Sequence, residues 1–284
     1  MSEQTELPTI VDPWFVVAFE GWNDAADAAS AVVDHLVEWW EADQVAEIDP
    51  DDYYDFQVNR PHLGPDETGK RVLTWPTTRI YVARPVGSDR DVVLVRGIEP
   101  NMRWSAFCDE LVGLAERFTS HAVVTLGALL ADTPHTRPVP VTGTTNDPDL
   151  ESRLSLDDSS YEGPTGINGV FTLACVEAGL PTVSLWAAVP HYVAQPPSPK
   201  ATLALLGYLE DVLEVSLPIG DLRELARAWE RGVEDLSSSD PDIAAYVESL
   251  EEARDTSELP EASGDAIARE FERYLKRRSR DTDS

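Results

Sequence analysis

Basic residues are scarce in this sequence. Its 284 residues include 52 aspartates and glutamates but only 22 lysines and arginines, which gives a formal net charge of −30 at pH 7. The first basic residue is Arg60. Nucleic acids and anionic membrane surfaces attract proteins of the opposite charge, so we expect neither as a partner. The acidic excess is typical first of a GC-rich genome or a salty cytoplasm, and alternatively of a protein that meets a basic partner.

Cysteines and long apolar runs are also lacking. Cys108 and Cys175 each lie in an apolar, helix-like segment, which favours buried, reduced thiols over a disulfide. No run reaches the roughly 18 apolar residues of a membrane span, and the start of the chain has no basic residue of the kind that opens a signal peptide. We therefore expect a cytoplasmic protein.

The apolar residues form short runs that alternate with helix-like segments. Buried strands are predicted at 14–19, 79–83, 91–96, 122–126 and 182–188, with glycines ending the third and fourth, and helices at 25–40, 102–118, 165–178 and 198–213. Residues 71–75 and 79–83 are expected to form a hairpin or bend, and 139–142 a short strand. This alternation predicts a three-layer α/β domain around a mostly parallel or mixed sheet.

From residue 221 the sequence changes in character. Apolar residues recur at helical spacing over 222–236, 243–250 and 267–275, and strand-like runs are absent. We interpret 1–220 as the α/β domain and 221–284 as an acidic helical extension. Residues 251–264 are expected to form a flexible joint within it.

Unusual polar residues follow the predicted strands. The carboxyl ends of parallel strands share one edge of a sheet, where ligands bind, so we expect one crevice there. Its candidate residues are Glu20, Asn23, Asp24, Glu99, Asn101, Asp132, His135, Arg137, Tyr161, Thr165 and His191. Structural roles remain open for many of them: Asp24 and Thr165 can cap helices, Glu20 and Glu99 can bind loop amides, and a lone histidine is often simply hydrogen-bonded.

Established catalytic and cofactor motifs are missing. We find no glycine-rich phosphate loop, no nucleophile elbow and no metal-ligand spacing of histidines, so we expect no metal or cofactor and assign no catalytic residue. A stiff, proline-rich segment precedes the predicted helix at 198. It predicts a contact between identical subunits, formed by Trp186, Tyr192, Gln195, Pro196 and Pro197.

Six segments of the chain resemble one known family. They are Phe19-Glu-Gly-Trp-Asn-Asp-Ala25, Tyr54-Asp-Phe-Gln-Val-Asn-Arg60, Gly97-Ile-Glu-Pro-Asn101, Gly127-Ala-Leu-Leu-Ala-Asp-Thr-Pro-His-Thr-Arg-Pro138, Tyr161-Glu-Gly-Pro-Thr-Gly166 and Val189-Pro-His-Tyr-Val-Ala-Gln-Pro-Pro-Ser-Pro-Lys200. Together they are similar to the PAC2 (proteasome assembly chaperone 2) family, over about residues 14–230.

The resemblance implies a fold like that of purine nucleoside phosphorylases and self-association, with a trimer favoured. Relatives of this family are chaperones that bind proteasome α-subunits, some through a hydrophobic-Tyr-X tail. The residues Arg280-Asp-Thr-Asp-Ser284 depart from that tail, so docking by tail insertion is not expected.

Two functions therefore stand as hypotheses. The first is a protein-binding assembly factor that acts as a homo-oligomer without catalysis, with proteasome subunits as partners. The second is a small-molecule enzyme or binding protein that uses the strand-end crevice for a nucleoside- or phosphate-like ligand.

Overall fold

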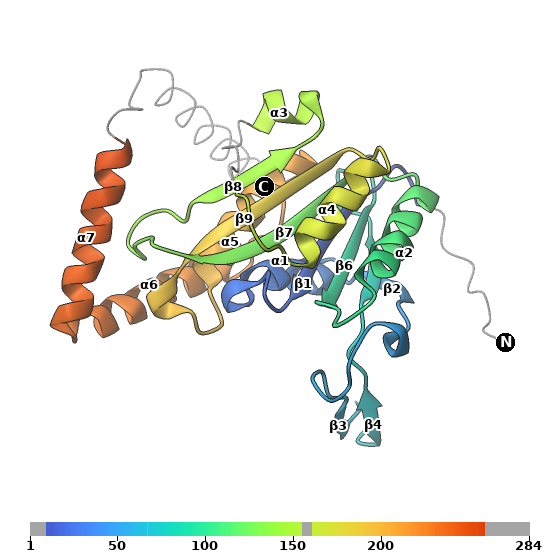
Figure 1. Ribbon diagram of the computed structural model, residues 1–284, viewed down its shortest axis with the longest axis horizontal. Coiled ribbons are helices and arrows are strands. Elements are labelled where there is room, and N and C mark those ends of the chain that lie inside the picture. Colours follow the sequence, from blue (N-terminus) through green and yellow to red (C-terminus); the bar gives the residue numbers. More distant parts are fainter. Residues whose placement is uncertain (1–9, 67, 155–160, 259–284) are drawn as a thin grey trace.

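A computed structural model describes residues 10–66, 68–154 and 161–258. Its centre is a seven-stranded sheet in the order β2-β5-β6-β1-β7-β9-β8 (Figure 1). The four middle strands run parallel to one another, whereas β2, β5 and β8 are antiparallel to their neighbours. The strands are β1 (Trp14–Glu20), β2 (Asp43–Glu47), β5 (Arg79–Ala83), β6 (Val92–Ile98), β7 (Ala122–Ala131), β8 (Val141–Thr145) and β9 (Thr182–Pro190). The predicted mixed, mostly parallel sheet is confirmed.

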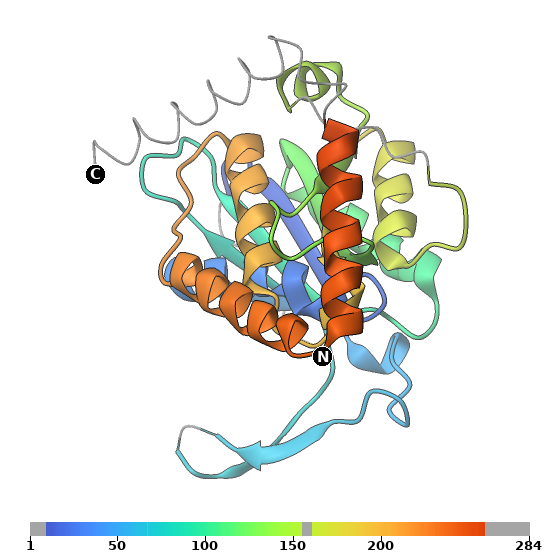
Figure 2. The ribbon, with the colours of Figure 1, turned by 90° about the vertical axis from the view of Figure 1, so that its left-hand side faces the viewer.

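Helices cover both faces of the sheet (Figures 1 and 2). One face packs on α1 (Ala28–Trp39) and α5 (Pro199–Leu213), and the other on α2 (Trp104–Arg117) and α4 (Ile167–Glu177). The central strand β1 is buried on both sides because its side chains alternate between the two cores, Val16 facing one and Phe15 the other. The three-layer architecture is confirmed.

Both cysteines lie in the core between the sheet and helices α2 and α4. Cys108 and Cys175 are buried free thiols, as expected. Burial raises the pKa of each to about 12, so both stay protonated at neutral pH.

The chain continues beyond the α/β layers into two helices, here called the arm. Helix α6 (Leu222–Ser238) packs against α5, and α7 (Pro241–Glu258) stands at the margin of the molecule (Figure 2). The expected flexible joint at 251 is wrong as far as residue 258, because α7 continues through it. The predicted helix at 267–275 lies outside the described residues, and the division at residue 220 stays a prediction.

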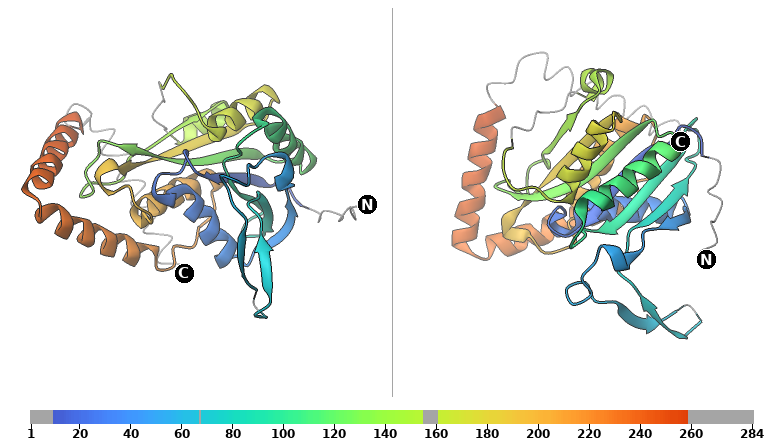
Figure 3. Two further views of the ribbon diagram at one scale, coloured as in Figure 1. Left: turned by 60° about the horizontal axis from the view of Figure 1, so that its bottom comes forward. Right: turned by 45° about the vertical axis from the view of Figure 1, so that its right-hand side comes forward.

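Strands β3 (His62–Pro65) and β4 (Arg71–Thr74) form a separate two-stranded ribbon, which projects from the body (Figure 3). Of the hairpin or bend expected between 71–75 and 79–83, the hairpin is therefore wrong. Its two segments belong to different sheets, since β4 pairs with β3 and β5 pairs with β2 and β6. Between them Thr77 is buried and donates to the carbonyl oxygen of Ile48, which fixes the exit from the ribbon.

Two strands run through glycines that were expected to end them. β6 includes Gly97 and β7 includes Gly127. A Cβ at Gly127 would lie 2.7 Å from the ring of Trp186, and one at Gly97 would lie 2.3 Å from Thr78 Oγ1. These glycines permit close packing across the sheet and do not act as stops.

The described helices include none that is long and apolar enough to cross a membrane. Three short helical turns, η1 (Ala25–Asp27), η2 (Pro50–Asp52) and η3 (His191–Val193), and helix α3 (Pro148–Leu154) complete the described elements.

Candidate functional site

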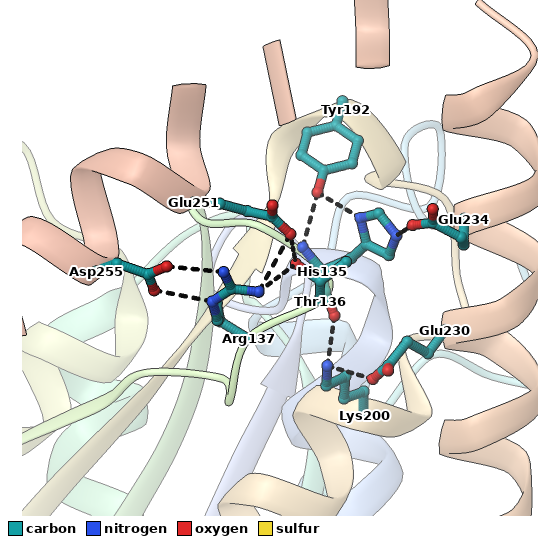
Figure 4. A network of polar contacts seen from close by, with 9 residues as sticks. All are labelled: His135, Thr136, Arg137, Tyr192, Lys200, Glu230, Glu234, Glu251 and Asp255. Carbon is teal, nitrogen blue, oxygen red and sulfur yellow. Dashed lines mark hydrogen bonds and ion pairs between the residues drawn. The ribbon is translucent and has the colours of Figure 1, made fainter. Parts of the chain in front are cut away.

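The predicted polar residues lie in loops at one edge of the sheet, where β1, β6, β7 and β9 end. Their contacts form two groups. The Glu99 group comprises Asn23, Glu99 and Gly166, at the start of α4. The His135 group joins the loop after β7 to α5 and to the arm (Figure 4). Its members are His135, Thr136, Arg137, Tyr192, Lys200, Glu230, Glu234, Glu251 and Asp255.

Glu99 ties two loops to a helix. Its Oε1 accepts hydrogen bonds from Asn23 Nδ2 and from the backbone N–H of Ile167, both at 2.9 Å. Ile167 is the first residue of α4, and the residue before it, Gly166, has no side chain to cap the helix. Glu99 therefore supplies from a distant loop the carboxylate that a helix N-terminus favours. The expected helix start and cap at Thr165 is wrong, because α4 begins two residues later.

Asn23 is fully buried in the same group. Its amide nitrogen donates to Glu99, whereas its Oδ1 has no hydrogen-bond partner among the described residues. Gly166 packs directly against it: a Cβ there would lie 2.2 Å from Asn23 Oδ1 and 2.8 Å from Glu99 Oε1. The glycine is required by this close approach.

Glu20 and Asp24 have structural partners within the chain. Glu20 binds Arg96 at 2.5 Å, and Arg96 also binds Asp34 at 2.8 Å. Asp24 is buried and accepts from the backbone N–H groups of Ala29 and Ser30 at 2.7 and 3.2 Å. Burial raises the pKa of Asp24, while these hydrogen bonds act in the opposite direction. The capping role left open for Asp24 is confirmed, although it caps α1 across the turn η1.

Asn101 and Tyr161 also make contacts within the chain. Asn101 Oδ1 accepts from the backbone N–H of Asp55 and from Asn59 Nδ2, which holds the 55–59 loop. Tyr161 is exposed, and its hydroxyl donates to the carbonyl oxygen of Pro164 at 2.8 Å. Both residues therefore shape loops at the edge where they were expected.

His135 is the buried centre of the second group. Its Nδ1 lies 2.8 Å from the hydroxyl of Tyr192, its Nε2 lies 3.1 Å from Glu234, and its backbone N–H donates to the same hydroxyl. Burial lowers the pKa of His135 and raises that of Tyr192 to about 12. These contacts suit a neutral imidazole that accepts from Tyr192 at Nδ1 and donates to Glu234 at Nε2.

Two cations extend this group toward the arm. Lys200, in the first turn of α5, donates to the carbonyl oxygen of His135 and pairs with Glu230 of α6. Arg137 binds both carboxylate oxygens of Asp255, at 2.8 and 2.9 Å, and Glu251 at 3.2 Å. Thr136 also donates to Glu251. Three carboxylates of the arm thus pair with two cations, and a fourth, that of Glu234, contacts His135 (Figure 4).

Asp132 and His191 lie beside this group. His191 Nδ1 is 3.2 Å from Asp132, and the hydroxyl of Tyr246 on α7 donates to the same carboxylate at 3.1 Å. The rings of His191, Tyr192 and Tyr246 meet edge to face, with centroids 5.4–6.1 Å apart. Aromatic contacts thus add to the polar ones that hold α7.

The predicted subunit contact lies partly on the surface. Gln195, Pro196 and Pro197 are exposed, and the Pro196–Pro197 peptide bond is cis. Trp186 is half-buried, with its ring over Gly127 and its Nε1 donating to Ser184. Tyr192, by contrast, bonds to His135 within the chain.

The arm side of the His135 group was not expected from the sequence. The signal was present: Glu230 and Glu234, and Glu251 and Asp255, are acidic pairs four residues apart, and such pairs share one helix face. Helical acidic pairs usually face solvent, so nothing in the sequence indicated that Glu230 binds Lys200 or that the other three bind residues about a hundred positions earlier.

A cavity of about 350 Å³ lies at the opposite edge of the sheet, beside Ala122 and Pro181. Arg153 and Glu214 in its lining pair with each other at 2.6 Å. None of the predicted site residues lines it. Within the described ranges, no group of three or more histidines, cysteines or carboxylates is arranged to hold a metal ion.

Comparisons with known proteins give consistent matches. The model of the PAC2 family matches residues 18–237. A PAC2 family protein from Streptomyces avermitilis is 58% identical, with a TM-score of 0.78, over 83% of this chain and 100% of that one. A proteasome-assembly chaperone homologue from Mycobacterium tuberculosis is 54% identical, with a TM-score of 0.76, over 82% of this chain and 99% of that one.

The fold extends to archaeal proteins. PbaB from Pyrococcus furiosus, described as an archaeal proteasome activator, is 17% identical with a TM-score of 0.63, over 82% of this chain and 96% of that one. At this identity the likeness concerns the fold alone. No curated protein is significantly similar in sequence to the chain.

Proposed function

The chain belongs to the PAC2 family, and from that premise we propose that it is a protein-binding assembly factor similar to the proteasome-assembly chaperones. The observation that carries the proposal is the similarity to the Mycobacterium tuberculosis homologue, which extends over nearly the whole of that protein. The proposed partners are proteasome subunits. The proposed form is a soluble, cytoplasmic homo-oligomer that acts without catalysis.

The geometry of the strand-end loops supports binding over catalysis. A general acid or base needs a titratable group that can reach a substrate. Both ring nitrogens of His135 are engaged by Tyr192 and Glu234, and the guanidinium of Arg137 is engaged by the arm. Glu99 is used to cap α4. These polar residues therefore hold loops and helices in place.

Self-association is the second part of the proposal, with a trimer favoured. The exposed segment at Gln195–Pro197 and the half-buried Trp186 are proposed to lie at the contact. Leu129 supports this placement, since it is 42% exposed on the strand next to Trp186. Light scattering at micromolar concentration is expected to give a trimer mass, and a monomer mass would contradict this part of the proposal.

The test of partner binding uses the full chain and purified proteasome subunits from the same cells. Mixtures are separated by size-exclusion chromatography at low and at raised salt. We expect a complex at low salt that weakens as salt rises, because screening reduces the attraction of a strongly acidic surface for a basic one. Separate elution of the chain and every subunit at low salt would refute the assembly-factor role.

One observation favours a second candidate function. The Oδ1 atom of Asn23 is buried without a hydrogen-bond partner among the described residues, next to the start of α4. Such an atom can accept from an N–H or O–H of a small ligand at the Glu99 group. Thermal stabilisation by nucleosides, nucleotides or phosphate would support this function, and unchanged melting with all three would count against it.

A further inference from the structure

Helix α7 is attached to the body mainly by polar side chains. Val247 is the one buried residue between positions 241 and 256 of this helix. Ile243 remains exposed, and Tyr246 meets the body through ring edges and a hydrogen bond to Asp132. An attachment this polar resembles a transient contact between proteins more than a hydrophobic core. Exposed ion pairs add little stability, so α7 is held weakly.

Helix α6 has an attachment of its own, which does not depend on α7. It packs against α5, and Glu230 on it pairs with Lys200. Residues 239 and 240 alone join the two helices of the arm. If α7 turned about this link, α6 would keep its contacts while the surface around Arg137 became accessible (Figure 4). Helix α7 is therefore a separable occupant of that surface.

The part of α7 that touches the body follows a simple repeat. Val247, Glu251 and Asp255 are four residues apart, so they lie along one face of the helix. Arg137 binds both oxygens of Asp255, at 2.8 and 2.9 Å, and binds Glu251 at 3.2 Å. Thr136 also donates to Glu251. A fork of N–H donors on two oxygens is the contact by which arginine selects carboxylates. The surface therefore suits an apolar residue followed by two carboxylates, each one helical turn further on.

This surface, formed by Thr136, Arg137 and Tyr192, is here called the acidic-helix site. We infer that it binds an acidic helix of a partner protein, and that α7 occupies it in the free chain. Charge complementarity identifies the occupant, because Arg137 is a permanent cation that already holds two carboxylates, in a chain of net charge −30. The partner's helix is expected to carry aspartate or glutamate at two positions four residues apart, after an apolar residue. Such a helix replaces both carboxylates at once, so Arg137 keeps a counter-charge.

The inference goes beyond the proposed assembly role and its test needs no proteasome subunit, so the two can fail separately. The test uses the full chain with Glu251→Gln/Asp255→Asn, here called the release variant, which removes both charges that Arg137 binds. The matched control is Glu248→Gln/Glu252→Gln. These two glutamates are exposed on the same helix at the same spacing, and they form no ion pair within the part of the chain that the structure describes.

The probe is a fluorescein-labelled, alanine-rich helical peptide with one leucine and two glutamates at four-residue steps. A second peptide has glutamine in place of both glutamates, and a third has the sequence of residues 241–258. Binding is followed by fluorescence anisotropy at about 0.15 M salt, where repulsion by the rest of the acidic chain is screened beyond about 8 Å. Amide exchange of α7, measured by mass spectrometry, reports whether the release variant frees the helix.

We expect the release variant to bind the glutamate peptide about tenfold more tightly than the wild type and the control do, because the tethered competitor has been weakened. Adding Arg137→Met to the release variant should abolish binding, and the glutamine peptide should not bind.

Three results would overturn the inference. The first is equal affinity of the release variant and the wild type for the glutamate peptide, and the second is binding that persists without Arg137. The third is unchanged amide exchange of α7 in the release variant, because its two carboxylates would then not hold the helix on the site. Binding confined to the peptide of residues 241–258 would restrict the site to the chain's own arm and refute a partner.

Discussion

Replacing Gly166 by alanine tests whether the close packing of Gly166 against Asn23 and Glu99 stabilises the fold. The backbone of Gly166 is extended, with φ −94° and ψ −170°, so its conformation suits any residue. The added methyl group would lie 2.2 Å from Asn23 Oδ1. Asn23 is fully buried and its amide nitrogen donates to Glu99, so moving its side chain away from the added methyl group breaks or strains that hydrogen bond.

The magnitude follows from two effects. Forcing a methyl group into a packed site costs about 1–3 kcal/mol. Displacing Glu99 from the start of α4 costs about 0.5–2 kcal/mol more, the usual range for a lost N-cap. We expect the free energy of unfolding to fall by about 2–4 kcal/mol. At roughly 2–4 °C per kcal/mol for a large domain, the Tm is then lower by roughly 4–16 °C.

The assay is thermal unfolding of a double-mutant cycle with Asn23→Ala. Removing the Asn23 side chain removes the clash, so Gly166→Ala should destabilise the Asn23→Ala protein less than half as much as the wild type. Equal destabilisation in the two backgrounds would refute the argument. The control is Gly232→Ala on α6, where a Cβ meets no atom within 4 Å, and helix propensity predicts a gain of about 0.5–1 kcal/mol.

Further predictions concern the arm and the core. Arg137→Met is expected to speed amide exchange in α7 severalfold, measured by mass spectrometry, and unchanged exchange would show that its ion pairs do not hold the helix. Burial lowers the pKa of His135 and of His121, so the unfolded chain takes up protons first as pH falls below about 6.5, and the free energy of unfolding should fall there. Denaturant titrations at several pH values measure how steeply the free energy of unfolding falls with pH, and His135→Asn should make that fall less steep. A pH dependence identical to that of the wild type would show that His135 does not cause it. Cys108 and Cys175, with pKa values of about 12, should resist alkylation by iodoacetamide at pH 8 until the chain is unfolded, so rapid labelling of the native protein would contradict their burial.

The layered fold was predictable because its central strands are continuous apolar runs followed by amphipathic helices. Two peripheral strands, β2 and β3, were not predicted. β2 has the sequence Asp-Gln-Val-Ala-Glu, from Asp43 to Glu47, and charged residues of this kind protect sheet edges while hiding the strand pattern. Leu73 and Arg79 lie on apolar runs that are adjacent in the sequence, yet their strands belong to different sheets. The partner of each strand depends on residues far away in the sequence, and the local spacing of apolar residues does not reveal it.

The sequence allowed many residues of the candidate site to be predicted, but not which of them contact one another. Asn23, Glu99 and the loop at Gly166 were singled out from three separate segments, and the fold brings them into contact. The link from His135 to Glu234 spans 99 positions, and no local pattern specifies such a pair. The sequence also could not indicate that Asp24 caps α1 through a turn with left-handed backbone at Ala26 and Asp27, since neither residue is a glycine.

The polar attachment of the arm has a consequence for any acidic segment that approaches Arg137 and Lys200. Glu251 and Asp255 already occupy Arg137, and they belong to a helix joined to α6 by residues 239 and 240 alone. A ligand held on so short a tether acts at an effective concentration on the order of millimolar. An outside carboxylate therefore competes with an intramolecular one, and only a partner that also gains contacts elsewhere on the molecule would displace the arm.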